Sequence, residues 1–349
     1  MSAFFLSSMQ MKKYVLIPLV VLTMAACGNK EQKADDPLAD SGRTQRTENL
    51  LTNLKQLGDS GVYLFGHQDD PVCGVGWSGN ENRSDVERVC NDYPALVGFD
   101  LGGIEKGDTV NSDGVPFSRI REEAIRHFDQ GGMVTISWTI TGQMNGKEQI
   151  DPVADFLNTL ETPYGVKVPV VLRLRKNQTK ELWHMVVDRL KEKEVTNALY
   201  AYSADANPEA DEAKYMANYP SDDIIDIMGI DCYCIAADAD SLQIAGFAEL
   251  LDKNLTMVGS VAKKHQKAVA VTETGYKCIA YKYWWTKTLS PVLAKHPISY
   301  VLVWRNANQG IDDYYAPFPG QRTYSDFVRY YNEKNTLFLH DINGLYLHK

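Results

Sequence analysis

The sequence lacks the features that mark several common protein classes. It has six cysteines in 349 residues, with no Cys-x-x-Cys pair and no His/Cys cluster, so nothing in it indicates a structural zinc site. Basic residues are fewer than acidic ones, 36 against 45, and the net charge of −9 argues against nucleic acid or an anionic membrane surface as the main partner. Besides Cys27 there are five cysteines, an odd number that cannot pair completely; a Cys73–Cys90 bridge and buried free thiols both remain open.

The amino terminus resembles an export signal. Met11-Lys-Lys is followed by an apolar run over 14–26, shorter than the roughly 18 residues expected of a membrane span. Met24-Ala-Ala-Cys27 resembles a bacterial lipoprotein box, so we predict lipidation of Cys27; a plain signal peptide with an incidental cysteine is the alternative. The predicted organisation is a signal peptide over 1–26, a flexible polar tether over 27–46 and one folded domain over 47–349.

Eight short apolar runs bounded by turn residues predict a repeated strand pattern. They cover 62–65, 95–99, 133–138, 168–172, 199–202, 225–230, 268–272 and 300–304. Predicted helices follow the second, fourth, sixth and seventh runs, over 118–130, 179–193, 244–265 and 284–296. This alternation predicts an α/β protein with a closed (β/α)8 TIM barrel. A doubly wound open sheet is the alternative, but no Gly-x-Gly-x-x-Gly follows the first strand to support its dinucleotide-binding form.

Polar or aromatic residues stand at or just past the end of each predicted strand, where a barrel places its catalytic face. They are His67, Asp100, Glu105, Trp138, Arg173, Ser203, Asp231, Tyr233, Glu273, Trp304 and Arg305.

Glu273 is the strongest single candidate among them. It ends the run Ala268-Val-Ala-Val-Thr-Glu, so its carboxylate should stand at the rim of the barrel. A neighbouring arginine would keep it ionised, as a nucleophile requires. The alternative is a structural ion pair with Arg173 or Arg305. Asp231 and Tyr233 have the period-two spacing that points both to one side of a strand, and Trp304 could form the floor of a sugar subsite.

Several segments in the right order carry a family resemblance. Tyr63-Leu-Phe-Gly-His-Gln-Asp-Asp, Gly229-Ile-Asp-Cys-Tyr, Thr272-Glu-Thr-Gly-Tyr and Tyr300-Val-Leu-Val-Trp-Arg-Asn-Ala resemble glycoside hydrolase family 26, and the similarity runs from about residue 47 to the carboxyl terminus. It is strongest to β-mannanases of Bacteroides-like bacteria.

The resemblance implies a (β/α)8 barrel that cleaves β-1,4-mannosidic bonds of mannan, glucomannan or galactomannan with retention and without a metal or other cofactor. It implies Glu273 as nucleophile. Residues around the mannose next to the cleaved bond would be His67, Arg173, Asp231, Tyr233 and Trp304, and Trp138 is added as a substrate-binding candidate from its strand end. The expected partner is mannan or manno-oligosaccharide, the expected state a monomer, and the expected location the bacterial outer membrane, held there by the lipid anchor on either face.

Two segments depart from the family pattern. After the fourth strand the family has Arg-Pro-x-His-Glu, which supplies the acid, and then a tryptophan-rich loop; here the chain reads Arg173-Leu-Arg-Lys-Asn-Gln and a helix follows at once. After Trp138 the expected His, Asn-Pro and long loop are also missing, so the barrel is expected to be incomplete in these two loops.

Three explanations stay open at this point. The sequence is a shortened form of an active mannanase, or a catalytically impaired mannan-binding lipoprotein on a hydrolase scaffold, or another carboxyl such as Asp205 or Glu105 donates the proton. Glu181 is not a substitute, because it lies a turn or more inside the helix that follows the fourth strand.

Overall fold

The computed structural model describes residues 36–79, 82–142, 144, 146–175, 178–309 and 312–348. The strands are β1 (Tyr63–Gln68), β2 (Cys73–Gly74), β3 (Trp77–Ser78), β4 (Leu96–Asp100), β5 (Met133–Thr139), β6 (Val170–Arg175), β7 (Ala198–Asp205), β8 (Ile227–Cys234), β9 (Ala268–Tyr276), β10 (Tyr300–Val303) and β11 (Thr336–Leu337). The α-helices are α1 (Gln45–Asp59), α2 (Glu87–Cys90), α3 (Phe117–Asp129), α4 (Asp151–Thr159), α5 (Lys180–Glu192), α6 (Glu212–Met216), α7 (Ser241–His265), α8 (Ser290–Leu293) and α9 (Tyr324–Tyr331). Short 3₁₀ segments are η1 (Ile104–Lys106), η2 (Lys147–Ile150), η3 (Lys277–Ile279) and η5 (Leu339–Asp341), and η4 (Trp285–Leu289) is a π-helix.

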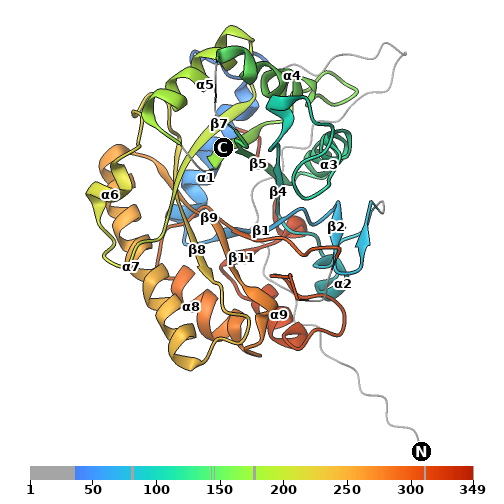
Figure 1. Cartoon of the computed structure of the whole chain (residues 1–349), viewed down its shortest axis with the longest axis vertical. Helices are drawn as coiled ribbons and strands as arrows, with labels where there is room; N and C mark the ends of the chain where they lie inside the picture. The colour runs from blue at the N-terminus through green and yellow to red at the C-terminus, as the bar shows by residue number, and fades with distance from the viewer. Residues whose placement is uncertain are drawn as a thin grey trace, which may run out of the picture.

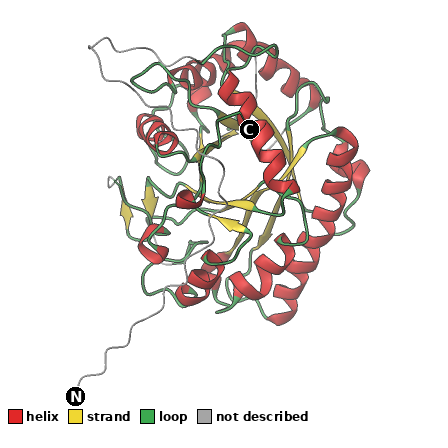
Figure 2. Cartoon of the chain, turned by 180° about the vertical axis from the view of Figure 1, so that it is seen from behind, coloured by secondary structure: helices red, strands yellow, loops and turns green. Residues whose placement is uncertain are grey.

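The strands confirm the predicted closed barrel. The main sheet has the order β10-β9-β8-β7-β6-β5-β4-β1-β11, and β10 also pairs in parallel with β1, so the eight strands without β11 form a ring. Helices lie around the outside of that ring in both views (Figures 1 and 2). All eight predicted strands overlap an observed one, and the largest differences are at the carboxyl ends of β8 and β9, which run on to Cys234 and Tyr276.

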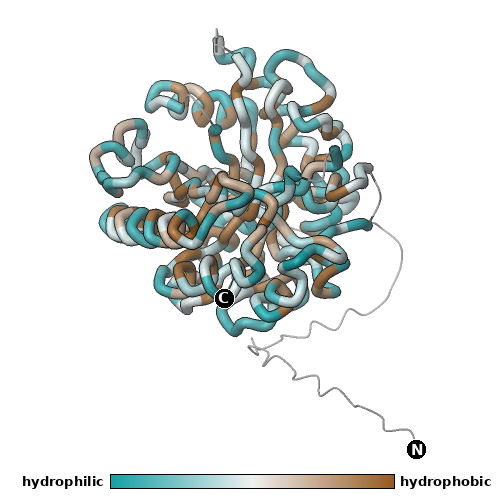
Figure 3. The backbone as a smooth tube through the Cα atoms, turned by 60° about the horizontal axis from the view of Figure 1, so that its bottom comes forward, coloured by the Kyte–Doolittle hydropathy of each residue, from teal (hydrophilic) through white to brown (hydrophobic). Residues whose placement is uncertain are grey.

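Two apolar layers hold the barrel together. Inward-facing side chains near the amino-terminal ends of the strands fill its interior: Leu64, Leu96, Val171, Leu199, Ile227 and Tyr300. Outward-facing side chains pack under the helices, and Phe65 shows the pattern, with its ring against those of Trp285 and Phe327. The outer helices alternate hydrophilic and hydrophobic residues along their length, as expected when one face packs on the barrel (Figure 3).

Local signals explain where the predicted helices begin. The Thr179 side chain accepts a hydrogen bond from the amide of Leu182 at the start of α5. Asp240 and Gln243 form a capping box at the start of α7. The segment predicted as a helix over 284–296 is instead a π-helix followed by the single turn of α8.

The amino-terminal boundary needs a correction. Residues 36–46 were expected to belong to a flexible tether, but Arg43 makes a two-point ion pair with Asp226 of the barrel and α1 already begins at Gln45, capped by Thr44. Cys27 and the rest of the predicted leader lie outside the described residues. Within the part of the chain that the structure describes, no helix is both long enough and apolar enough to cross a membrane.

No disulfide bond links the helices and strands that the structure describes. Cys73, Cys90, Cys232, Cys234 and Cys278 are all free thiols, so the Cys73–Cys90 bridge is not formed.

Candidate active site

Strand alternation sends one set of polar side chains into the carboxyl-terminal end of the barrel. On β6 the inward positions after Val171 are Arg173 and Arg175, and on β8 they are Asp231 and Tyr233. On β9 the register shifts by one residue: Ile230 pairs with Val271, but Asp231 pairs with Glu273. This extra residue, a β-bulge, turns Glu273 toward the lumen beside Asp231.

The Glu273 carboxylate is almost completely buried, with 1% of the residue exposed, and four donor groups hold it. Arg173 donates to Oε1 through Nη2. Arg175 approaches from the other side, with Nε 2.8 Å from Oε1 and Nη2 3.1 Å from Oε2. The Tyr233 hydroxyl donates to Oε2 over 2.8 Å. Because charge-assisted hydrogen bonds reach both oxygens, the carboxylate is fixed in orientation and its charge is compensated.

Asp231 forms the second carboxylate of the cluster. Arg173 Nη1 lies 2.9 and 2.8 Å from its two oxygens, and the hydroxyls of Ser203 and Thr272 donate to Oδ1 over 2.8 Å each. Burial raises the pKa of Asp231 to about 6; Arg173 opposes that rise, and the charge of Glu273 adds to it.

The charges of the cluster balance one another. Arg173, 3% exposed in its side chain, bridges Asp231 and Glu273. Its burial would lower its pKa, but the two carboxylates outweigh that effect and raise the pKa. Burial and the charge of Glu273 raise the pKa of Tyr233 well above its ordinary value, so its hydroxyl keeps its proton and acts as a donor.

Trp304, directly after β10, lies at the same place. Its backbone amide donates to the carbonyl of Thr274, which ties it to β9. The Arg175 guanidinium stacks over its ring, 4.6 Å from the ring centre. The structure thus brings together five of the residues singled out from the sequence: Arg173, Asp231, Tyr233, Glu273 and Trp304.

His67 does not join this cluster, contrary to the expectation that it lines the sugar site. A Cβ atom on Gly98 would lie 2.2 Å from Oε1 of Gln68, which places Gln68 on the lumen side of β1. The adjacent His67 therefore faces outward, where its Nδ1 lies 2.7 Å from Asp70 and both side chains are buried.

Trp138 is also outside the lumen. Its neighbours on β5, Ser137 and Thr139, both donate to the inward-facing Asp100. The Trp138 indole is 0% exposed, belongs to the outer apolar layer and donates to Glu105 over 3.0 Å. Its role is therefore to hold Glu105, and it offers no face to a sugar.

Of the two carboxyl groups named as alternative proton donors, Glu105 fits poorly. Trp138, the amide and hydroxyl of Thr141 and the amide of Gly103 all donate to it. Although burial would raise its pKa, these bonds outweigh burial and lower it. A carboxylate held ionised by four donors is a weak acid catalyst. Asp205 is exposed at the end of β7, level with Asp231 across the β7–β8 pair.

Sequence reasoning missed Arg175 as a member of the site. The signal was present, because a residue two positions after Arg173 on the same strand must point the same way. The structure also confirms the short connection after β6: the strand ends at Arg175 and α5 begins at Lys180.

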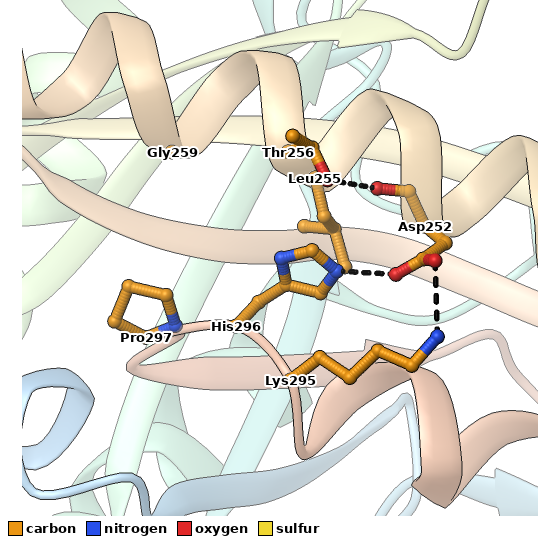
Figure 4. A pocket seen from close by; sticks show the side chains of 7 residues that line it. All are labelled: Asp252, Leu255, Thr256, Gly259, Lys295, His296 and Pro297. Atoms are coloured by element: carbon orange, nitrogen blue, oxygen red, sulfur yellow. Dashed lines mark hydrogen bonds and ion pairs between the residues drawn. The ribbon is translucent and has the colours of Figure 1, made fainter.

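A hollow lies on the outer wall of the barrel, between α7 and the segment before β10 (Figure 4). Its charged groups are paired with one another: Asp252 lies 2.8 Å from His296 Nε2 and 3.0 Å from Lys295 Nζ. Since 295–297 precede β10, this hollow is toward the amino-terminal ends of the strands, away from Glu273.

Comparisons with known proteins agree with this fold. The model of glycosyl hydrolase family 26 matches residues 144–287. A mannan endo-1,4-β-mannosidase from Bifidobacterium adolescentis is 25% identical over 86% of the chain, and the chain spans about a third, 35%, of that relative's length.

Solved structures give a closer match. A family 26 β-mannanase from Bacteroides ovatus is 40% identical, with a TM-score of 0.82 over 88% of this chain and 98% of that one. A family 26 protein from a Muricauda species is 25% identical, with a TM-score of 0.74 over 87% and 94% of the two chains. The match to the Bacteroides ovatus enzyme is 40% identical over nearly the whole of that enzyme, and the family model matches the central part of this chain. The chain therefore belongs to glycosyl hydrolase family 26.

Proposed function

We propose that the chain hydrolyses β-1,4-mannosidic linkages in mannan, glucomannan or galactomannan with retention, through a glycosyl-enzyme intermediate on Glu273. The observation that carries the proposal is the placement of the Glu273 carboxylate at the carboxyl-terminal rim of the barrel, held by Arg173 and Tyr233. The names of the similar β-mannanase and β-mannosidase support the substrate class.

The first chemical step would use the side chains as follows. An oxygen of Glu273 bonds to the anomeric carbon, while the bond from that carbon to the leaving oxygen breaks. Arg173 and Tyr233 orient the carboxylate and compensate its charge, and Asp231 would accept a hydrogen bond from a sugar hydroxyl. In the second step water attacks the same carbon, and Glu273 leaves as a carboxylate.

Both steps need a second carboxyl group, about 5–5.5 Å from the first, to move the proton. Among the described residues, the side chains bonded to Glu273 are two arginines and a tyrosine, and the family acid after β6 has no counterpart in the sequence. General-acid assistance is worth roughly 10²–10⁴-fold, so we expect slow hydrolysis of unactivated mannan.

An aryl β-mannoside with a good leaving group tests the role of Glu273 without that acid, because such a phenolate leaves unprotonated. We expect a burst of phenol stoichiometric with enzyme, and no burst from Glu273→Ala. A burst that survives Glu273→Ala would remove Glu273 as nucleophile.

A second function has an observation in its favour. Arg175 engages both oxygens of Glu273, and the connection after β6 is short, which together support a catalytically impaired mannan-binding lipoprotein. In this case the aryl mannoside gives no burst, while manno-oligosaccharides still raise the melting temperature, because a ligand that binds only the folded state stabilises it.

We further propose that Cys27 carries a lipid that anchors a monomeric, secreted protein to the bacterial outer membrane. The support is the sequence Met24-Ala-Ala-Cys27 after a basic and apolar leader. Cys27→Ser should lose fatty-acid labelling and move from the membrane to the soluble fraction. Labelling that persists in this variant excludes Cys27 as the attachment point.

A further inference from the structure

Arg175 lies in the space between the nucleophile and the aromatic ring. Its guanidinium reaches Glu273 with Nε at 2.8 Å from Oε1 and Nη2 at 3.1 Å from Oε2. The same planar group stacks on Trp304 at 4.6 Å from the ring centre. Arg175 therefore contacts both the proposed nucleophile and the tryptophan ring on which a sugar would stack.

A bound sugar would need these two contacts for itself. For attack, its anomeric carbon must come within about 3–3.5 Å of a Glu273 oxygen. For stacking, its apolar face must lie against the Trp304 ring. A sugar and the Arg175 guanidinium cannot both hold these positions.

We infer that Arg175 is the resident occupant of the sugar position beside Glu273 and decides which ligands enter it, since a sugar binds there only after displacing this side chain. The inference rests on the proposed function, because it takes the space at Glu273 and Trp304 to be a sugar subsite.

The contacts explain why the side chain stays in place when no sugar is present. Arginine and carboxylate meet in a two-point, charge-assisted pair, and the guanidinium adds a cation–π contact with tryptophan. The partner carboxylate is 1% exposed, so solvent screens the pair less than it would at the surface. The Arg175 side chain itself is 24% exposed, which leaves it a path toward solvent when it is displaced.

Tryptophan fluorescence provides a test that needs no sugar. The chain has six tryptophans, and Trp77, Trp138, Trp183, Trp284 and Trp285 are all buried, whereas Trp304 is partly exposed. Quenching by acrylamide, a small neutral molecule, therefore reports mainly on Trp304. We expect the quenching constant to rise in Arg175→Ala and Arg175→Gln, and the added quenching to disappear when Trp304→Phe is combined with either.

Arg329→Ala is the matched control, because it removes an arginine from α9 whose side chain is 64% exposed. Thermal melting of every variant checks that the fold is intact, and Arg175→Gln keeps side-chain length if the alanine variant does not fold. A quenching constant that is the same in wild type and both folded Arg175 variants overturns the inference, whatever the substrate is.

Mannobiose, titrated by calorimetry, is the second probe. When Arg175 occupies the sugar position about nine-tenths of the time, the apparent affinity of that position for a sugar falls about tenfold. Arg175→Ala should therefore bind mannobiose about tenfold more tightly than wild type. Equal binding by both proteins overturns the inference. Increased quenching with no mannobiose binding to either protein keeps Arg175 as the occupant but contradicts the proposed mannan substrate.

Discussion

Replacing Arg173 by leucine tests how the buried charges of the site hold the fold. The guanidinium is 3% exposed and bridges Asp231 and Glu273. In Arg173→Leu, Glu273 keeps its contacts with Arg175 and Tyr233, but Asp231 keeps only the hydroxyls of Ser203 and Thr272. The variant therefore leaves the largely buried carboxylate of Asp231, whose side chain is 13% exposed, without a cation.

Removing one partner of a buried ion pair costs about 3–5 kcal/mol of unfolding free energy. The cost depends on pH, because the pKa of Asp231 is about 6 in the folded protein against an ordinary value of 3.8. A carboxyl whose folded pKa is raised binds its proton more tightly in the folded state, so its stabilising contribution is complete at low pH and is lost as pH rises toward about 6. Without Arg173, the largest effect that opposes this rise is gone and only the hydroxyls of Ser203 and Thr272 still lower the pKa, so the loss of stability should be largest near neutral pH.

Urea unfolding followed by circular dichroism at about pH 7.5 and about pH 5 measures both effects. Arg189→Leu is the control, since Arg189 pairs with Asp151 on the outer helices and its loss should change stability far less at either pH. If Arg173→Leu loses less than about 1 kcal/mol, or loses as much at the lower pH, Asp231 does not depend on this cation as the contacts indicate.

Three further changes separate the roles of individual side chains. Tyr233→Phe removes a hydrogen bond to a charged group, worth about 1.5–3 kcal/mol, so the aryl mannoside burst should slow roughly 10- to 100-fold in stopped-flow assays; an unchanged burst would show that the hydroxyl does not orient Glu273. Trp138→Phe leaves Glu105 short of a donor and should cost about 1–3 kcal/mol in urea unfolding, but leave mannobiose affinity unchanged; weaker binding at full stability would place Trp138 in the sugar site after all. Asp231→Asn removes the titrating group, so the decline of stability between about pH 4 and about pH 6 should flatten in a pH series of urea titrations, and a decline that persists must come from other groups.

The barrel was predictable from sequence because parallel strands covered on both faces are nearly all apolar. Apolar runs such as Ala268-Val-Ala-Val-Thr are easy to recognise between turn residues, and the presence of eight such runs predicted the closed ring of strands. The cluster of Asp231, Tyr233 and Glu273 followed from the same pattern, since all three lie toward the carboxyl ends of two neighbouring strands, β8 and β9. The β-bulge that brings Glu273 level with Asp231 was not predictable, because no turn residue marks it.

Position near a strand end does not decide the direction of a side chain. A shift of one residue moves a side chain to the other face of a strand, and the exact register was not visible in the sequence. His67 and Trp138 were chosen by position and face outward, while their neighbours Gln68 and Ser137 face the lumen. Arg175 was missed for a different reason. It lies in the segment that departs from the family motif, where the missing acid hides the fact that Arg175 has the same inward direction as Arg173.

The structural and catalytic interpretations of Glu273 use the same contacts. An ion pair with Arg173 was the alternative to a nucleophilic role, and the structure shows that pair. A nucleophile needs a compensating cation as much as a structural carboxylate does, so the pair cannot separate the two roles. Arg175 can separate the two roles. A purely structural carboxylate is already held by Arg173 and Tyr233, so it gains nothing specific from a second guanidinium that is stacked on Trp304. If removing Arg175 increases the burst of phenol from the aryl mannoside, Glu273 is a nucleophile that Arg175 blocks. If it only lowers the melting temperature, the ion pairs are there for the fold.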